Sequence, residues 1–198
     1  NPRTIGDLFA AQSGKFVSVS AGDGLEAIMA GHGSGAASLS ARAGVGENAT
    51  VLNIDIGGGT TKLAVCKDGE VTHCTAIDAG ARLITFDEFN VITHIEPFGQ
   101  KYLARMGREM KVGDTISDHE KTALAKLMVD QIMAAIKGMP LDGLYRMPVL
   151  PANASYRKIV FSGGVCEYIA NPELANFGDL GKALASEIAF RVADAGID

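Results

Sequence analysis

The 198-residue sequence contains no tryptophan, and aromatic residues make up only 6% of it. It has no apolar run near the roughly 20 residues that a membrane-spanning helix needs, so neither a transmembrane segment nor a membrane partner is predicted. Basic residues are in the minority, with 18 Lys and Arg against 23 Asp and Glu, and this balance argues against nucleic acid as a partner. Its three cysteines, Cys66, Cys74 and Cys166, form no Cys-x-x-Cys pair, so neither a disulfide framework nor a zinc site is indicated.

Apolar residues make up 47% of the chain and charged residues 21%, a balance that predicts a folded α/β protein and excludes a disordered one. Glycine is the distinctive residue: there are 24, and ten of them fall between Gly22 and Gly59. Such a cluster indicates either a loop-rich region or backbone that must approach a ligand closely. The ordered elements predicted around the cluster favour the second interpretation.

Alternation of apolar and polar residues predicts strands over 16–20, 51–56, 61–66, 70–77, 85–86 and 157–161. Asp68-Gly69 is a strong hairpin signal, so residues 51–77 should form a three-stranded antiparallel meander. With a two-residue turn there, Val65 should face Thr72, Leu63 should face Cys74, and Cys66 should face Val71.

Capping-box spacings at Asp23/Glu26 and Ser117/Glu120 predict two helix starts. The first helix should end in 31–35 and restart over 36–43, and the second should stop at Gly138. Further helices are predicted from about Val165 and over 180–195, a linker over 44–48, and a turn over 96–99.

The strongest motif is Asp55-Ile56-Gly57-Gly58-Gly59-Thr60-Thr61, which places a carboxylate at the end of an apolar strand and three glycines at the following turn. Backbone N–H groups in such a turn can converge on an anion. Asp55 could hold Mg²⁺ through its waters beside the phosphates, and the two threonine hydroxyls could donate to phosphate oxygens. A returning strand follows, so this is neither a Walker loop nor a dinucleotide fingerprint. A purely structural hairpin with an incidental aspartate is the alternative.

A second motif, Phe161-Ser162-Gly163-Gly164-Val165, ends a strand in two glycines before a helix. This arrangement allows a flat ring to lie against the backbone at a helix start. Standing alone, the motif is better explained as a tight strand-to-helix turn, and the presence of the first motif reverses this balance in favour of a ligand. His32, His73, His94 and His119 are scattered away from ligand spacing, and the cysteines are expected to be small core residues.

Together these residues resemble the actin, hexokinase and DnaK-type ATPase superfamily. Residues 55–61 are similar to its second phosphate hairpin, and Phe161–Gly164 to its adenosine motif. Residues 21–35 are similar to its first connecting helix. The segments 16–36 and 51–60 are further similar to the ethanolamine ammonia-lyase reactivating factors, the EutA family. The resemblance is tight from Phe16 to Gly80, loosens from Phe86 to Pro151, and returns at Phe161.

The resemblance implies an actin-like (ribonuclease H-like) ATPase fold and an ATP-dependent chaperone that releases damaged cobalamin from its adenosylcobalamin enzyme, ethanolamine ammonia-lyase. It implies ATP/ADP and Mg²⁺ as cofactors, with Asp55 as the catalytic and metal residue. Gly57, Gly58, Gly59, Thr60, Thr61, Gly163 and Gly164 would then bind the nucleotide. The resemblance implies a location in the bacterial cytoplasm, close to the ethanolamine microcompartment. Whether the protein forms a homo-oligomer is left open.

Two features of the superfamily, the first phosphate loop and the closing strand after the last helix, find no match in the sequence. We therefore interpret residues 1–48 as the tail of the first lobe with the connecting helix, and residues 49–198 as most of the second lobe. The superfamily's chaperones also carry a glutamate where Gly22 aligns. ATP hydrolysis is expected of the complete protein and not of this chain alone.

Two other functions stay open. A small-molecule kinase of the same superfamily would need a substrate base, for which Asp78, Asp87 and Glu88 are the candidates. A non-enzymatic interaction module would use the glycine hairpin only structurally, and Asp55→Asn would then change neither ligand binding nor client activity.

Overall fold

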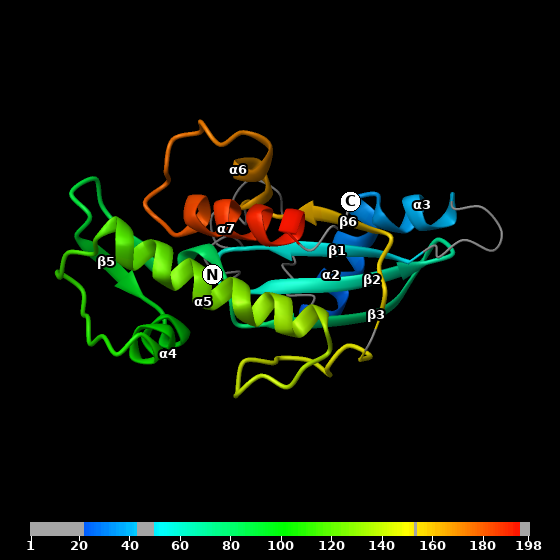
Figure 1. Cartoon of the computed structure of the whole chain (residues 1–198), viewed down its shortest axis with the longest axis horizontal. Coiled ribbons are helices and arrows are strands. Elements are labelled where there is room, and N and C mark those ends of the chain that lie inside the picture. The colour runs from blue at the N-terminus through cyan, green and yellow to red at the C-terminus, as the bar shows by residue number, and fades with distance from the viewer. Residues whose placement is uncertain (1–21, 43–49, 153, 195–198) are drawn as a thin grey trace, which may run out of the picture.

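The computed structural model describes residues 22–42, 50–152 and 154–194 (Figure 1). Its centre is a four-stranded sheet in the order β3-β2-β1-β6. The strands are β1 (Val51–Ile56), β2 (Thr61–Lys67), β3 (Glu70–Ile77) and β6 (Lys158–Ser162). The predicted antiparallel meander is confirmed for β1 to β3, and β6 joins β1 in parallel, so the protein is α/β with a mixed sheet. The strand predicted over 16–20 and the linker over 44–48 lie outside the described residues.

The predicted register of the β2–β3 hairpin is right at its tip and wrong beyond it. Cys66 faces Val71 as expected, but Val65 faces His73 and Leu63 faces Thr75, each one residue further along. The cause is a β-bulge between Val65 and Cys66 that leaves Thr72 as an extra residue on β3. The Thr72 hydroxyl donates to the Val65 carbonyl oxygen at 3.2 Å, across the bulge.

Helices cover both faces of the sheet, with α5 (Asp118–Ile136) and α7 (Gly181–Asp194) in front and α2 (Gly22–Gly33) behind in Figure 1. The alternating side chains of β1 separate the two faces. Leu52, Ile54 and Ile56 belong to the main hydrophobic core with α5 and α7, whereas Val51 joins a small cluster with α3 (Ala36–Ala41). The predicted break between α2 and α3 is confirmed, and glycine at position 31 lets α2 approach the sheet, because a Cβ there would lie 2.9 Å from Val71.

The two predicted capping boxes have different outcomes. Ser117 caps α5 as predicted, with its hydroxyl accepting from the Glu120 N–H and Glu120 accepting from the Ser117 N–H. The prediction for Asp23 is wrong, because α2 already begins at Gly22 and the Glu26 carboxylate pairs with Lys62 of β2 at 2.6 Å.

A second, two-stranded sheet of β4 (Ile84–Phe86) and β5 (Ile92–Ile95) lies beside α4 (Pro97–Arg105). The short helical turn η1 (Ala81–Leu83) connects it to β3. The turn predicted over 96–99 is wrong, because Pro97 occupies the first turn of α4, where its missing N–H costs nothing. The remaining helix, α6 (Cys166–Ala170), follows β6 close to the predicted Val165.

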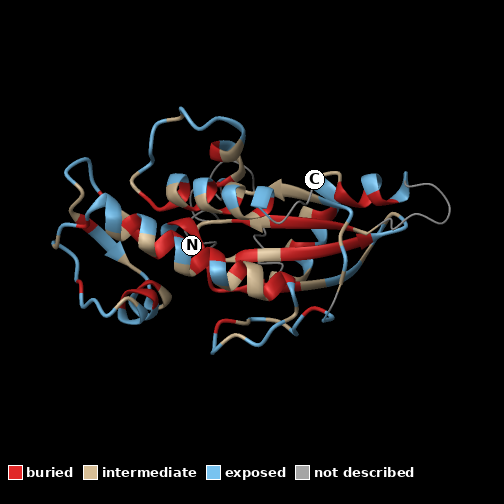
Figure 2. Ribbon diagram, viewed as in Figure 1, coloured by how far each residue is buried: buried red, intermediate tan, exposed pale blue. Residues whose placement is uncertain are grey.

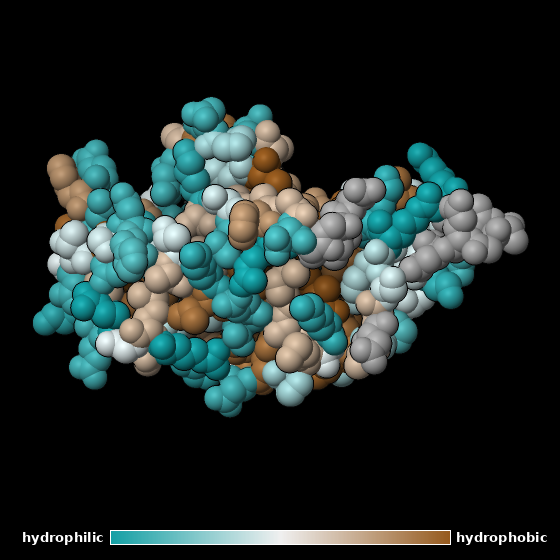
Figure 3. Space-filling model, viewed as in Figure 1, coloured by the Kyte–Doolittle hydropathy of each residue, from teal (hydrophilic) through white to brown (hydrophobic). Residues whose placement is uncertain are grey.

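Burial follows this architecture, with the central strands and the inward faces of α5 and α7 buried (Figure 2). On the face drawn in Figure 3, hydrophilic side chains predominate and apolar atoms show only in small areas between them. Among the described residues, no helix is both long and apolar enough to cross a membrane.

Candidate functional site

In the turn between β1 and β2, residues 57–60, three backbone N–H groups have no hydrogen-bond partner in the described part of the chain. The Gly57 N–H closes the turn by donating to the Thr60 carbonyl oxygen at 3.0 Å. The N–H groups of Gly58, Gly59 and Thr60 donate to no partner among the described residues. Consecutive free N–H groups of this kind form a concavity that suits an anion.

Packing within the protein does not require glycine at the tip of this turn. None of the three glycines has a positive φ. A Cβ built on Gly59 would meet no atom within 4 Å, and one built on Gly58 would touch only the side chain of Arg82, at 3.4 Å. Since the fold would accept side chains here, their absence leaves the space over the N–H groups open.

Gly80, which sequence analysis did not single out, supports the turn from outside. A Cβ at this position would lie 2.5 Å from the Gly58 carbonyl oxygen, although its backbone is extended and free of strain. This close approach lets the Ala81 N–H donate to the Gly57 oxygen at 3.0 Å and the Arg82 N–H donate to the Gly58 oxygen at 2.6 Å. The η1 segment therefore fixes the glycine turn. No repeat or motif marks Gly80, which stands alone in the sequence.

The parallel pairing of β1 with β6 brings the second motif to the first. Asp55 stands opposite Ser162, whose hydroxyl donates to Asp55 Oδ1 at 3.2 Å. Gly163 follows with φ +82°, and a Cβ there would lie 2.5 Å from both Asp55 Oδ1 and the Ile56 oxygen. Glycine at 163 is therefore a requirement of the fold, while the exposed Gly164 meets no neighbour within 4 Å.

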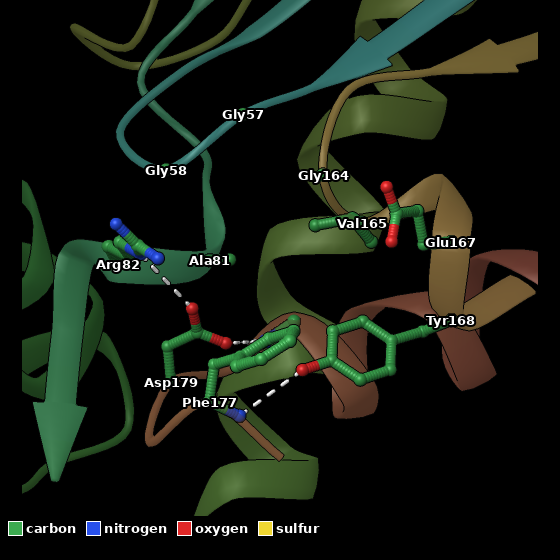
Figure 4. A pocket seen from close by; sticks show the side chains of 11 residues that line it. Gly57, Gly58, Ala81, Arg82, Gly164, Val165, Glu167, Tyr168, Phe177 and Asp179 are labelled. Carbon is green, nitrogen blue, oxygen red and sulfur yellow. Dashed lines mark hydrogen bonds and ion pairs between the residues drawn. The ribbon is translucent and has the colours of Figure 1, made fainter. Parts of the chain in front are cut away.

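A cavity of about 260 Å³ opens between the two glycine motifs (Figure 4). Gly57 and Gly58 lie along one side of it, Gly164, Val165 and Glu167 along another, and the rings of Tyr168 and Phe177 close it below. The remaining lining residues are Ala81, Arg82, Asp179 and Gly181. Gly57 and Gly58 of the first motif and Gly164 of the second therefore line one cavity.

Its aromatic wall depends on a buried tyrosine. Tyr168 is 5% exposed, and its hydroxyl donates to the Ala175 oxygen and accepts from the Phe177 N–H, both at 3.2 Å. Burial raises the pKa of the Tyr168 phenol, so it is a neutral hydrogen-bonding group. The Phe177 ring is 70% exposed and lies 6.0 Å from the Tyr168 ring, which leaves an apolar face for a flat ligand.

The charged groups at the cavity are one guanidinium and two carboxylates, from Arg82, Asp179 and Glu167. Arg82 Nε lies 3.4 Å from Asp179 Oδ2 (Figure 4). Sequence analysis missed Arg82 because it lies in a stretch of weak periodicity, and missed Phe177 and Asp179 because they lie in the loop before α7. An aspartate two residues ahead of a helix was the available signal for Asp179.

A neighbouring cavity of about 480 Å³ shares Gly58 and Arg82 with the first and adds Gly59 and Thr60. The predicted residues Gly57, Gly58 and Gly164 therefore line the first cavity, and Gly59 and Thr60 line the second. Asp78 also lines the second, but its carboxylate is 8% exposed and pairs with Arg146 at 3.1 Å, so it is not a free base.

Three predicted residues, Asp55, Thr61 and Gly163, lie outside both cavities. Asp55 shares a strand face with Lys62, which pairs with Glu26 of α2, so its carboxylate lies on the face of the sheet that α2 covers. Thr61 is fully buried, and its hydroxyl donates to the Ala79 oxygen at 2.7 Å. The expected phosphate contact of Thr61 is therefore corrected to a structural hydrogen bond.

The other candidates are not gathered into a site. Across the described residues, no three His, Cys, Asp or Glu side chains lie together as metal ligands would. Asp87 accepts from the N–H groups of its own loop and Glu88 is exposed, so neither forms a second base with Asp78. Burial raises the pKa of Cys66 to about 11, and burial, Glu167 and Asp55 raise that of Cys166, so both are inert thiols.

Fold and site thus define an α/β protein in which two glycine turns, one between antiparallel strands and one between a strand and a helix, open on a shared cavity. Residues 1–194 match the family described as "Ethanolamine utilisation protein EutA", and the chain belongs to that family. It is 33% identical over 180 residues to the ethanolamine ammonia-lyase reactivase EutA of Salmonella typhimurium strain LT2 and 32% identical to that of Escherichia coli K12. Each alignment covers 88% of this chain and 38% of the relative, so the chain spans well under half of either.

Proposed function

We propose that this chain is the nucleotide-binding part of an ATP-dependent factor that reactivates ethanolamine ammonia-lyase by releasing damaged, adenosyl-less cobalamin. The observation that carries the proposal is that Gly58 and Gly164, from the two glycine motifs, line one cavity. Gly58 is one of three residues of the turn at 57–60 whose N–H groups have no partner among the described residues. The curated relatives, both named as reactivases of that lyase, supply the client.

The residues present fit a nucleotide in two parts. The N–H groups of Gly58 and Gly59 and the Thr60 hydroxyl would hold phosphate oxygens, since these groups make no hydrogen bond with the described residues. The base and ribose would lie against Gly164 and the Phe177 ring, with Gly163 fixing the path of the backbone. At about 260 Å³ the first cavity is slightly smaller than the roughly 300 to 1,000 Å³ usual for such ligands, and the adjoining cavity supplies the further room.

Mg²⁺ fits this site less completely. Asp55 is its one predicted ligand, and its carboxylate already accepts from Ser162. Mg²⁺ commonly takes one or two carboxylates and fills its remaining positions with waters and substrate phosphates. Because the Asp55 carboxylate lies outside both cavities, on the face of the sheet that α2 covers, it would hold the ion only through water, and the ion would supply positive charge to the phosphates.

In the proposed mechanism, nucleotide acts on the client through a change of conformation. A ligand shifts an equilibrium only by its difference in affinity for the two states. The turn at 57–60, η1 and the loop before α7 all contact the cavity, so these segments would differ between the nucleotide-bound and free states. The proposed setting is the bacterial cytoplasm near the ethanolamine microcompartment, with the lyase as protein partner.

The test measures binding of this chain to ethanolamine ammonia-lyase loaded with adenosyl-less cobalamin, with ATP, with ADP and without nucleotide. We expect the affinity for the lyase to change with the nucleotide, and Gly58→Val to abolish the change by filling the phosphate space. Gly107→Val is the control, because the residue lies outside both cavities and a Cβ there meets nothing within 4 Å, whereas one on Gly58 meets only the Arg82 side chain, at 3.4 Å. The φ of +69° at Gly107 makes this control the more strained of the two. Binding that is the same in all three conditions would instead identify a nucleotide-independent interaction module.

A further inference from the structure

Among the described residues, Arg82 is the one outside the glycine turn that lines both cavities, and its side chain packs directly on the tip of the turn. Its Cβ, Cγ and Cδ atoms lie 3.4 to 3.6 Å from the position of a Cβ on Gly58. The backbone N–H of Arg82 donates to the Gly58 oxygen at 2.6 Å, so the residue and the turn move together. The guanidinium therefore extends from the place where phosphate is proposed to bind.

The Arg82 guanidinium makes only one long hydrogen bond to a described residue, Asp179. Its Nε lies 3.4 Å from Asp179 Oδ2, beyond the roughly 2.7 to 2.9 Å of a strong charge-assisted hydrogen bond. Within the described part of the chain, its two terminal nitrogens donate no hydrogen bond. The side chain is 68% exposed, so it can be redirected without a large desolvation cost. A guanidinium with a free edge matches two oxygens of a phosphate.

Asp179, by contrast, is held firmly. Its side chain is 7% exposed, and Oδ1 accepts from the N–H of Gly181, the first residue of α7, at 2.8 Å. Asp179 also forms an isolated bridge with Thr85 of β4. If Arg82 turned away, Asp179 would stay in place and keep its bond to the start of α7.

We propose that Arg82 binds the outer phosphates of the nucleotide and that Asp179 competes with those phosphates for the same guanidinium. The proposal rests on the proposed function and names the residue that makes the site prefer ATP to adenosine. Binding of phosphate would draw Arg82 from Asp179, which lies directly before α7, so occupancy of the turn would change the charge at the start of that helix. Asp179 would lower the affinity for nucleotide in the resting state.

The test is a double-mutant cycle on the whole chain, with the dissociation constants for ATP and for adenosine measured by calorimetry. Arg82→Gln should weaken ATP binding by about tenfold and leave adenosine binding unchanged, because adenosine has no phosphate. Arg82→Lys should retain more affinity than Arg82→Gln, since the charge remains and only the paired donors are lost. Asp179→Asn should tighten ATP binding by about threefold to tenfold, and asparagine can still accept from the Gly181 N–H.

A general effect of removing negative charge must be separated from competition. Glu167→Gln supplies the control, because Glu167 lines the same cavity and has no ion pair with Arg82. Competition predicts that Asp179→Asn loses most of its effect in the Arg82→Gln background, whereas Glu167→Gln keeps its own smaller effect there. Equal tightening by Asp179→Asn with and without Arg82 would overturn the proposal.

The role of Arg82 and the nucleotide site itself are distinguished by different outcomes. If the unaltered chain binds ATP with measurable affinity and the cycle is additive, the role of Arg82 is wrong and the nucleotide site stands. If the unaltered chain binds neither ATP nor adenosine, both proposals are wrong.

Discussion

Replacing Gly80 by alanine should damage the candidate site from outside. The added Cβ would lie 2.5 Å from the Gly58 oxygen, 2.6 Å from the Gly59 carbonyl carbon and 2.7 Å from the Gly58 carbonyl carbon. A carbon and a carbonyl oxygen normally approach no closer than about 3.3 Å, so the turn and η1 must separate by about 0.8 Å. That shift would lengthen the hydrogen bonds from Ala81 and Arg82 to the turn, which now measure 3.0 and 2.6 Å.

The expected cost follows from the overlap. Extra atoms forced into packed structure cost about 1 to 3 kcal/mol. The φ of Gly80 is −167°, which alanine adopts readily, so the loss of glycine's freedom in the unfolded chain offsets about 0.4 to 1 kcal/mol. We expect Gly80→Ala to lower the free energy of unfolding by about 1 to 2 kcal/mol and to weaken nucleotide binding at the same time.

Gly59→Ala is the matched control, because its Cβ would meet no atom within 4 Å and its φ is not positive. Its free energy of unfolding should be equal to that of the unaltered chain or higher. Both variants are compared by equilibrium unfolding in urea, followed by circular dichroism. The reasoning is refuted if Gly80→Ala is as stable as Gly59→Ala.

Three further predictions concern buried polar groups. Thr61→Val should lower the free energy of unfolding by about 1 to 3 kcal/mol, since it leaves the Ala79 carbonyl unpaired; an unchanged urea midpoint would contradict this. Arg146→Gln should destabilise the chain by about 1 kcal/mol, because it removes the partner of the buried Asp78 while its own exposed side chain limits the cost; stability equal to the unaltered chain would count against it. Burial raises the pKa of the Cys66 thiol to about 11 in the folded protein, whereas the thiol of the unfolded chain has a pKa near 8.5. The buried thiol therefore contributes fully to the free energy of unfolding below about pH 8.5, and this contribution is lost as the pH rises towards 11. Cys66→Ala should accordingly show a smaller loss of stability from pH 8 to pH 10.5 than the unaltered chain.

The central part of the fold was predictable because its signals are local. Alternation over 51–77 and the Asp68-Gly69 turn specify the meander, and Ser117 with Glu120 specifies the start of α5. The bulge at Thr72 was not predictable, since it arises from pairing between strands. The parallel contact of β6 with β1 joins segments about a hundred residues apart and leaves no local mark.

The residues of the candidate site also divide into those that local sequence predicts and those that only the fold brings to the cavity. Glycine turns at 57–59 and 163–164 are visible in the sequence because their residue types repeat within a few positions. Arg82, Phe177 and Asp179 reach the cavity only through the packing of η1 and of the loop before α7. Thr61 was misplaced for a related reason: the sequence shows that it carries a hydroxyl, but only the fold shows that this hydroxyl donates its hydrogen bond to the Ala79 carbonyl oxygen.

The most direct test of the nucleotide site is a calorimetric titration of ADP, with and without Mg²⁺, into this chain and its Asp55→Asn variant in parallel. Asparagine can keep the hydrogen bond with Ser162, so the variant should remain folded. We predict saturable binding that Mg²⁺ tightens, and loss of that tightening in Asp55→Asn with Mg²⁺-free binding unchanged. An absence of ADP binding, or the same tightening by Mg²⁺ in both proteins, would contradict the account.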